Sequence, residues 1–129
     1  MEELTRTHVQ LLDRADEDSF LFELPLGLIT HSVSGETFET YSRLSLAEAQ
    51  RTLADLLRRG FVSLYEADDY RDVPIDDALA VVADPAFWAV PQDAPRLYGV
   101  VTTESGERAL LDAWPRFFDE HARPHERPA

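Results

Sequence analysis

Apolar residues recur at helical spacing in several parts of the chain, most regularly after Ser45. There they fall on one helical face: Leu46, Ala49, Leu53, Leu56 and Leu57. Ser45 and Glu48 have the spacing of a capping box, and Gly60 is placed to end the helix in the left-handed conformation. The pattern predicts a helix over about 45–59 with a buried leucine stripe.

The segment before this helix also has helical features. An amphipathic stretch over residues 1–18 predicts a leading helix that ends in an acidic cluster. Ser19 stands where an N-cap belongs, ahead of an apolar run, and this predicts a buried helix over about 20–31 that is kinked or begins at Pro25. After Ser34 and Gly35, a short helix is expected over 36–43, with Phe38 and Tyr41 on its inner face.

Beyond Gly60 the pattern changes to β-forming residues. Residues 61–65 and 97–102 predict two strands, which we expect to pair antiparallel although about thirty residues separate them. A helix over about 75–83 should lie between them and end at Asp84-Pro85. Thr103 is a good cap for a last helix over about 104–114.

Two segments carry a resemblance to a known family: LSLAEAQRTLADLLRRGFVSLY (44–65) and YGVVTTESGERALLDAW (98–114). They resemble the second helix and first strand, then the strand, turn and helix, of winged helix-turn-helix domains. With the segment before them, the resemblance covers residues 20–114. It implies an α+β, mostly helical fold with a small antiparallel β-sheet, here with an inserted helix and an acidic insertion in place of a short wing.

The domain organisation follows from the same elements. Residues 1–18 are expected to be an N-terminal helical extension, 19–118 the winged-helix domain and 119–129 a flexible C-terminal tail. Phe117 and Phe118 could belong to the core or to a dimer interface.

Charge alters the functional expectation. The chain has 25 acidic and 12 basic residues, a formal net charge of −13, which disfavours binding to phosphate backbones. We therefore expect a non-catalytic protein-interaction module, of a regulatory or antagonist type, that binds a basic protein partner. Its predicted contact residues are Glu66, Asp68, Asp69, Asp72, Asp76 and Asp77, with Trp88 as an interface anchor if it lies on the surface rather than in the core. The plain alternative is a solvated acidic loop.

The family resemblance supports a different function, a transcriptional regulator that binds DNA as a homodimer through residues 45–59. The residues that would contact DNA are Gln50, Arg51, Arg58 and Arg59. However, Asp55 lies four residues from both Arg51 and Arg59, so these side chains can pair along the helix instead. The sequence leaves the two functions open.

Catalytic and metal-binding patterns are missing. There is no cysteine, no nucleophile motif and no glycine-rich phosphate loop, so neither an enzyme nor a cofactor is expected. Asp68, Asp69 and Asp72 lack the spacing of a calcium loop. His121 and His125 are four apart, but Pro124 between them argues against a helical zinc site.

Location is inferred from what the sequence does not contain. The first residues, MEELTRTH, do not resemble a secretory signal, and no apolar run approaches the roughly 20 residues of a membrane span. We expect a cytoplasmic protein that does not cross a membrane.

Overall fold

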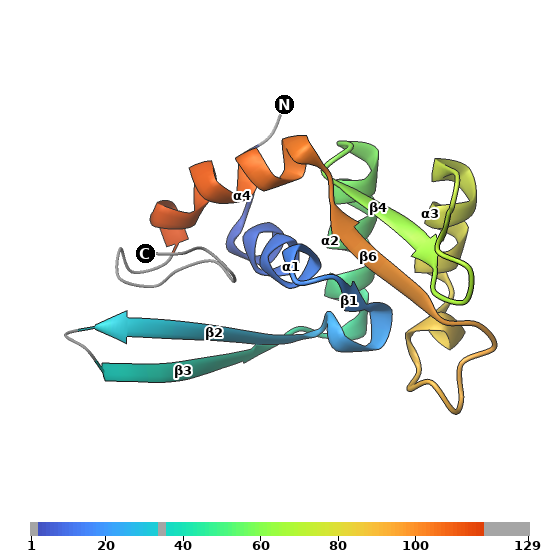
Figure 1. Ribbon diagram of the computed structural model, residues 1–129, viewed down its shortest axis with the longest axis horizontal. Coiled ribbons are helices and arrows are strands. Elements are labelled where there is room, and N and C mark those ends of the chain that lie inside the picture. The colour runs from blue at the N-terminus through green and yellow to red at the C-terminus, as the bar shows by residue number, and fades with distance from the viewer. Residues whose placement is uncertain (1–2, 34–35, 118–129) are drawn as a thin grey trace.

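The computed structural model describes residues 3–33 and 36–117, with only the backbone described over 26–42. It contains helices and strands in one α+β arrangement (Figure 1). The helices are α1 (Arg6–Asp16), α2 (Leu46–Arg58), α3 (Ile75–Ala83) and α4 (Glu104–Phe117), with short 3₁₀ turns η1 (Leu21–Glu23) and η2 (Pro85–Trp88). The strands are β1 (Ser19–Phe20), β2 (Leu26–Val33), β3 (Glu36–Arg43), β4 (Val62–Glu66), β5 (Arg71–Asp72) and β6 (Tyr98–Thr102).

The main sheet has four strands in the order β1-β6-β4-β5, and every neighbouring pair is antiparallel. β4 and β6 pair from Val62 opposite Thr102 to Glu66 opposite Tyr98. The predicted antiparallel pairing across the long insertion is therefore confirmed. The insertion contains β5, α3 and η2, so the predicted inserted helix is also present.

One hydrophobic core joins the helices to the sheet. It includes side chains from α1, α2, β6 and α4, among them Val9, Leu56, Val100 and Leu110, each without exposed surface. On α2, Leu53, Leu56 and Leu57 are 1%, 0% and 5% exposed, which confirms these three members of the predicted leucine stripe. Leu46, at the first turn of the helix, is 38% exposed and does not belong to the buried stripe. The leading helix α1 belongs to this same core.

The segment before α2 corrects the sequence analysis. The predicted helices over 20–31 and 36–43 are wrong, because this segment forms β1, η1 and a hairpin of β2 with β3. Ser19 caps no helix; its hydroxyl donates to the Arg14 carbonyl oxygen at 2.6 Å. Threonine, isoleucine and valine are frequent in residues 26–43, and these β-branched residues favour strands over helices. The hairpin extends to one side of the sheet (Figure 1).

This correction removes the helix-turn-helix from the described residues. A strand, β3, enters α2 where that motif needs a helix. The α+β class is confirmed, while a winged-helix topology is not. The C-terminal tail and Phe118 lie outside the described residues.

A tight joint links the end of α2 to the start of α4. Gly60 has a φ of 75°, as predicted for a glycine that ends a helix. The Thr103 hydroxyl donates to the Gly60 carbonyl at 2.7 Å and accepts the Gly106 amide at 3.1 Å, which confirms Thr103 as a cap. A Cβ on Gly106 would lie 1.8 Å from the Phe61 carbonyl oxygen, so this helix can approach the strand so closely only with glycine there.

Candidate interaction surfaces

Exposed carboxylates gather where β4, β5 and α3 meet. We call this set the acidic edge: Asp68, Asp69, Asp72, Asp76 and Asp77. Asp69 pairs with Arg71, at 3.8 Å between their charged atoms. In the part of the chain that the structure describes, the side chains of the other members have no hydrogen bond or ion pair. Solvation by water leaves their negative charge available to a partner.

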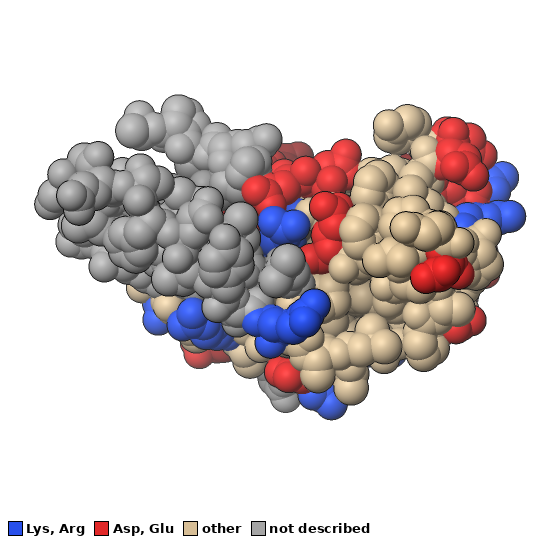
Figure 2. Space-filling model, turned by 90° about the horizontal axis from the view of Figure 1, so that it is seen from below, with Lys and Arg blue, Asp and Glu red and all other residues tan. Residues whose placement is uncertain are grey.

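Glu66, the remaining acid of the predicted set, has a different role. Its side chain is only 13% exposed and accepts hydrogen bonds from Arg71 and Arg96, each at 2.7 Å. These bonds, first that from Arg96 and then that from Arg71, lower the pKa of Glu66 below its ordinary value. Glu66 therefore stays ionised and is paired within the protein, and it engages the two cations nearest to the acidic edge. Red and blue side chains lie next to each other at the right-hand end of the molecule in Figure 2.

A hollow of about 500 Å³ adjoins the acidic edge, between β5 and α3. Its apolar lining comes from Val73, Pro74, Val81 and Tyr98. Asp72 and Asp77 also line it, together with the hydrogen-bonded pair of Glu66 and Arg71. Long cationic side chains bury an apolar stem while their charged head stays polar, so this combination suits a lysine or arginine of a partner.

Tyr70 is the most exposed large apolar residue of the described chain, at 78%. It follows Asp69 directly, in the left-handed conformation with φ 54°, and stacks on Tyr65 with ring centres 5.6 Å apart. Tyr65 is held in turn by donating its hydroxyl to Asp18. Burial and this hydrogen bond raise the pKa of Tyr65 above its ordinary value. Tyr70 is not among the residues predicted from sequence to contact a partner, although an aromatic residue inside an acidic run is a signal for an interface.

Trp88 does not belong to this surface, contrary to the prediction. Its side chain is 7% exposed, and the indole nitrogen donates to the Val82 carbonyl at 3.0 Å. A tryptophan with its N–H satisfied inside the protein is a core residue. The predicted interface anchor is therefore wrong.

The four residues predicted to contact DNA differ in whether their side chains are available to a ligand. Arg51 and Arg58 are exposed on α2 and have no hydrogen-bond or ion-pair partner among the described residues. Gln50 instead donates from its side-chain amide to the Val82 carbonyl at 3.1 Å. Arg59 donates to Asp55 at 2.9 Å and its side chain is 10% exposed. Only the first two residues are available to a ligand.

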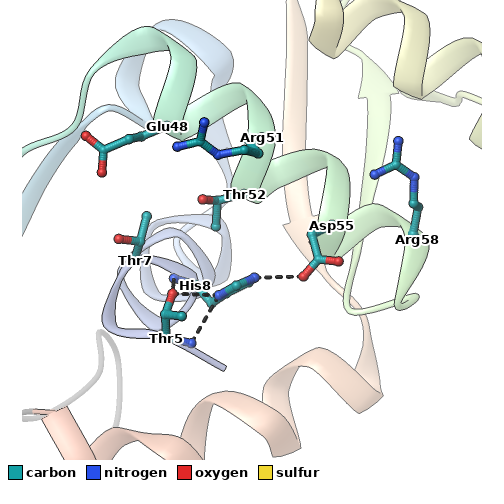
Figure 3. Close-up of a pocket in the computed structure, with 8 residues that line it drawn as sticks. All are labelled: Thr5, Thr7, His8, Glu48, Arg51, Thr52, Asp55 and Arg58. Carbon is teal, nitrogen blue, oxygen red and sulfur yellow. Dashed lines mark hydrogen bonds and ion pairs between the residues drawn. The ribbon is translucent and has the colours of Figure 1, made fainter. Parts of the chain in front are cut away.

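A polar hollow of about 420 Å³ lies between the start of α1 and α2 (Figure 3). The Thr5 amide donates to Nδ1 of His8 at 3.1 Å, so Nδ1 is an acceptor and the ring proton lies on Nε2. That nitrogen then donates to Asp55 at 2.8 Å. Burial alone would raise the pKa of Asp55, but the hydrogen bonds from His8 and Arg59 outweigh it and lower the pKa.

The order Thr5, His8, Asp55 looks like that of a catalytic triad, but the contacts are those of a helix cap. The Thr5 hydroxyl lies 2.7 Å from Nδ1 of His8 and accepts the His8 backbone amide at 3.3 Å. These bonds form a capping box at the first turn of α1. The group joins α1 to α2, and sequence reasoning missed it because His8 and Asp55 are 47 residues apart.

Metal sites and membrane-spanning helices are the remaining features to consider. Among the side chains that the structure describes, those of residues 3–25 and 43–117, no three His, Asp or Glu lie together as metal ligands would. Both His121 and His125 fall outside the described residues. Among the described helices, none has the length and apolar character needed to cross a membrane.

Comparisons with known proteins found no relative. No protein-family model matches the chain, and neither a curated protein nor a solved structure matches it.

Proposed function

We propose that this chain is a non-catalytic protein-interaction module that binds a basic protein partner through the acidic edge. The observation that carries the proposal is the hollow between β5 and α3, where Asp72 and Asp77 stand beside an apolar lining. These carboxylates have no partner within the described part of the chain. They are therefore free to pair with a cation.

Two further features support a protein partner. Tyr70 provides an exposed aromatic ring beside the carboxylates, and tyrosine is among the residues that contribute most to protein interfaces. The formal net charge of −13 adds long-range attraction for a basic partner, which raises association rates. Charge steers the encounter, and the hollow with Tyr70 supplies the contact area.

A DNA-binding regulator has less support. Arg51 and Arg58 are available, but Gln50 and Arg59 are occupied by contacts within the protein. Phosphate contacts supply most of the affinity for DNA, and two cations on an acidic molecule give few of them. Binding of random duplex should be no tighter than about 10⁻⁴ M at physiological salt.

The test begins with capture of partners from native cell extract after nuclease treatment, using the full chain as bait. A second bait carries Asp72→Asn and Asp77→Asn. A control bait carries Asp93→Asn and Asp112→Asn, which remove equal charge from exposed positions elsewhere. A partner of the acidic edge should be retained by the first and third baits and lost from the second.

Association rates of the captured partner then give the quantitative result. At low ionic strength, the Asp72→Asn, Asp77→Asn variant should associate about tenfold more slowly than the wild type, with a weaker dependence on salt. The association rate of the Asp93→Asn, Asp112→Asn control should fall much less. Equal rates and equal salt dependence for the two variants would show that the acidic edge is only solvated surface.

A further inference from the structure

A second hollow, of about 390 Å³, lies on the molecule between α2 and α3. Most of its lining is small or aliphatic: Ala47, Ala54, Leu79, Val82 and Ala83. Arg51 and Arg58 also line it, and we call the whole the α2–α3 groove. Small side chains allow a second backbone to come close, as at helix–helix contacts.

The two arginines have a regular placement. They are seven residues apart on α2, so they lie on the same face about 10.5 Å apart along the helix axis. Both are exposed, and neither side chain has a hydrogen bond or ion pair with any described residue. Arg59, beside them, is held by Asp55, and Arg71 and Arg96 are held by Glu66. The groove therefore has free positive charge on a chain that is acidic as a whole.

The groove is also fixed before any ligand binds. The side-chain amide of Gln50 donates to the Val82 carbonyl, which joins α2 directly to α3 across the groove. The indole nitrogen of the buried Trp88 donates to the same carbonyl. A site that is already ordered loses less conformational entropy on binding than one that must be assembled.

We propose that the α2–α3 groove binds an acidic amphipathic helix of a partner protein. Apolar side chains on one face of that helix contact Leu79 and the alanines, above the buried Val82. Carboxylates on its flank, two turns apart, pair with Arg51 and Arg58. This surface is separate from the acidic edge, and the inference does not rest on the function proposed above.

Other occupants fit the groove less well. Phosphate groups of a nucleic acid would pair with the arginines but gain nothing from the aliphatic lining. A second copy of this chain brings a net charge of −13 against one of the same sign. A helix with carboxylates and leucines uses both the charge and the apolar surface.

The experiment is a selection from a displayed library of helical 18-residue peptides with the full chain as bait. Leucines are fixed on one face, and each flanking position encodes glutamate, glutamine or lysine. The test bait is Arg51→Gln, Arg58→Gln. The control bait is Arg108→Gln, Arg116→Gln, which removes equal charge from α4. A fourth bait, Ala83→Glu, places a negative charge in the groove at an exposed position.

Wild-type and control baits should enrich glutamate at two flanking positions seven residues apart. Peptides selected on them should bind the Arg51→Gln, Arg58→Gln and Ala83→Glu proteins at least about tenfold more weakly. The Asp72→Asn, Asp77→Asn protein should bind them as the wild type does, so failure here and failure of the acidic edge are distinguishable.

Several results would overturn the proposal. One is equal enrichment of lysine and glutamate, and another is binding that is insensitive to the groove variants. Micromolar binding of duplex DNA that Arg51→Gln, Arg58→Gln abolishes would assign the arginines to nucleic acid. A dimer in sedimentation equilibrium that Ala83→Glu dissociates would assign the groove to a second copy.

Discussion

The acidic edge and the exposed face of α2 are organised in the same way with opposite sign. At the acidic edge, Glu66 takes the strong hydrogen bonds of Arg71 and Arg96. Arg71 also contacts Asp69 at 3.8 Å, and the side chains of the other aspartates are left without cations. On α2, Asp55 takes the hydrogen bonds of His8 and Arg59, and Arg51 and Arg58 are left without anions. In each region one carboxylate binds two donors.

The comparison shows that the charge a surface offers to a ligand depends on which of its side chains are already paired within the protein. Composition alone gives both regions a mixture of acids and arginines. After pairing, one region presents carboxylates and the other presents guanidinium groups. Substitutions at Leu56, Asp55 and Glu66 should disturb these two arrangements of charge, with the largest effect at Leu56.

Replacing Leu56 with alanine should destabilise the packing of α2, the helix that carries Arg51 and Arg58. Leu56 is fully buried on the face of α2 opposite its exposed arginines, so its loss removes apolar contact and leaves a cavity. The free energy of unfolding should fall by about 2–5 kcal/mol in chemical denaturation. Leu46→Ala, on the same helix but 38% exposed, is the control and should cost much less. A loss below about 0.5 kcal/mol for Leu56→Ala would mean that the buried face of α2 is assigned wrongly.

Asp55→Asn should have a smaller effect that depends on pH. The pKa of Asp55 is lowered in the folded protein from 3.8, so its charge stabilises the fold above pH 3.8, and this contribution is lost as the pH falls through the lowered value. Its side chain is 40% exposed, and solvent screening limits the effect to about 1 kcal/mol at neutral pH. Denaturation of wild type and variant should converge in acid.

The control for this change is Asp112→Asn on α4, an exposed carboxylate with no partner in the described chain. It should leave the stability unchanged at both pH values. A difference between wild type and Asp55→Asn that persists undiminished in acid would show that the ionised carboxylate is not what holds His8 and Arg59.

Glu66→Gln should have the smallest effect, and on binding rather than on folding. It frees Arg71 and Arg96 beside the aspartates, so the acidic edge becomes less negative than the loss of one charge implies. Association with the basic partner should slow about twofold more than it does for Asp112→Asn, the variant of equal net charge. Stopped-flow measurement at low salt checks this. Equal rates would mean that the two arginines stay in place without Glu66.

The parts of the fold that sequence predicts are those with local signals. Ser45 accepts the Glu48 amide at 3.1 Å and Gly60 ends the helix, as their positions imply. One detail differs, because the Glu48 carboxylate accepts the Ser45 hydroxyl rather than the Ser45 amide. Strands β4 and β6 are likewise marked by their β-forming residues. These elements need no knowledge of distant contacts.

The segment over 20–43 shows where such signals conflict. Ser19 before an apolar run resembles a helix start, whereas the β-branched residues and the two-residue gap between β2 and β3 are typical of a hairpin. In this segment the β-branched residues indicate the structure correctly. The predicted helices over 20–31 and 36–43 do not exist.

The candidate surfaces were predictable only in part. The acidic residues are evident in sequence, but Glu66 and Arg96 are 30 residues apart, so their pairing is a property of the fold. The groove depends in the same way on Gln50 meeting Val82. Which charges remain free is decided by these contacts between distant segments.

The strand order has a consequence for the order of events during synthesis. β6 lies between β1 and β4, which do not pair with each other. When the ribosome has made residues 1–97, β1 has no neighbouring strand and β4 has only the short β5. The sheet can close only once Tyr98–Thr102 emerges, and the joint between Gly60 and Thr103 forms at the same moment. We therefore expect a nascent chain whose residues from 98 onward are still inside the ribosome to be cleaved readily by proteases.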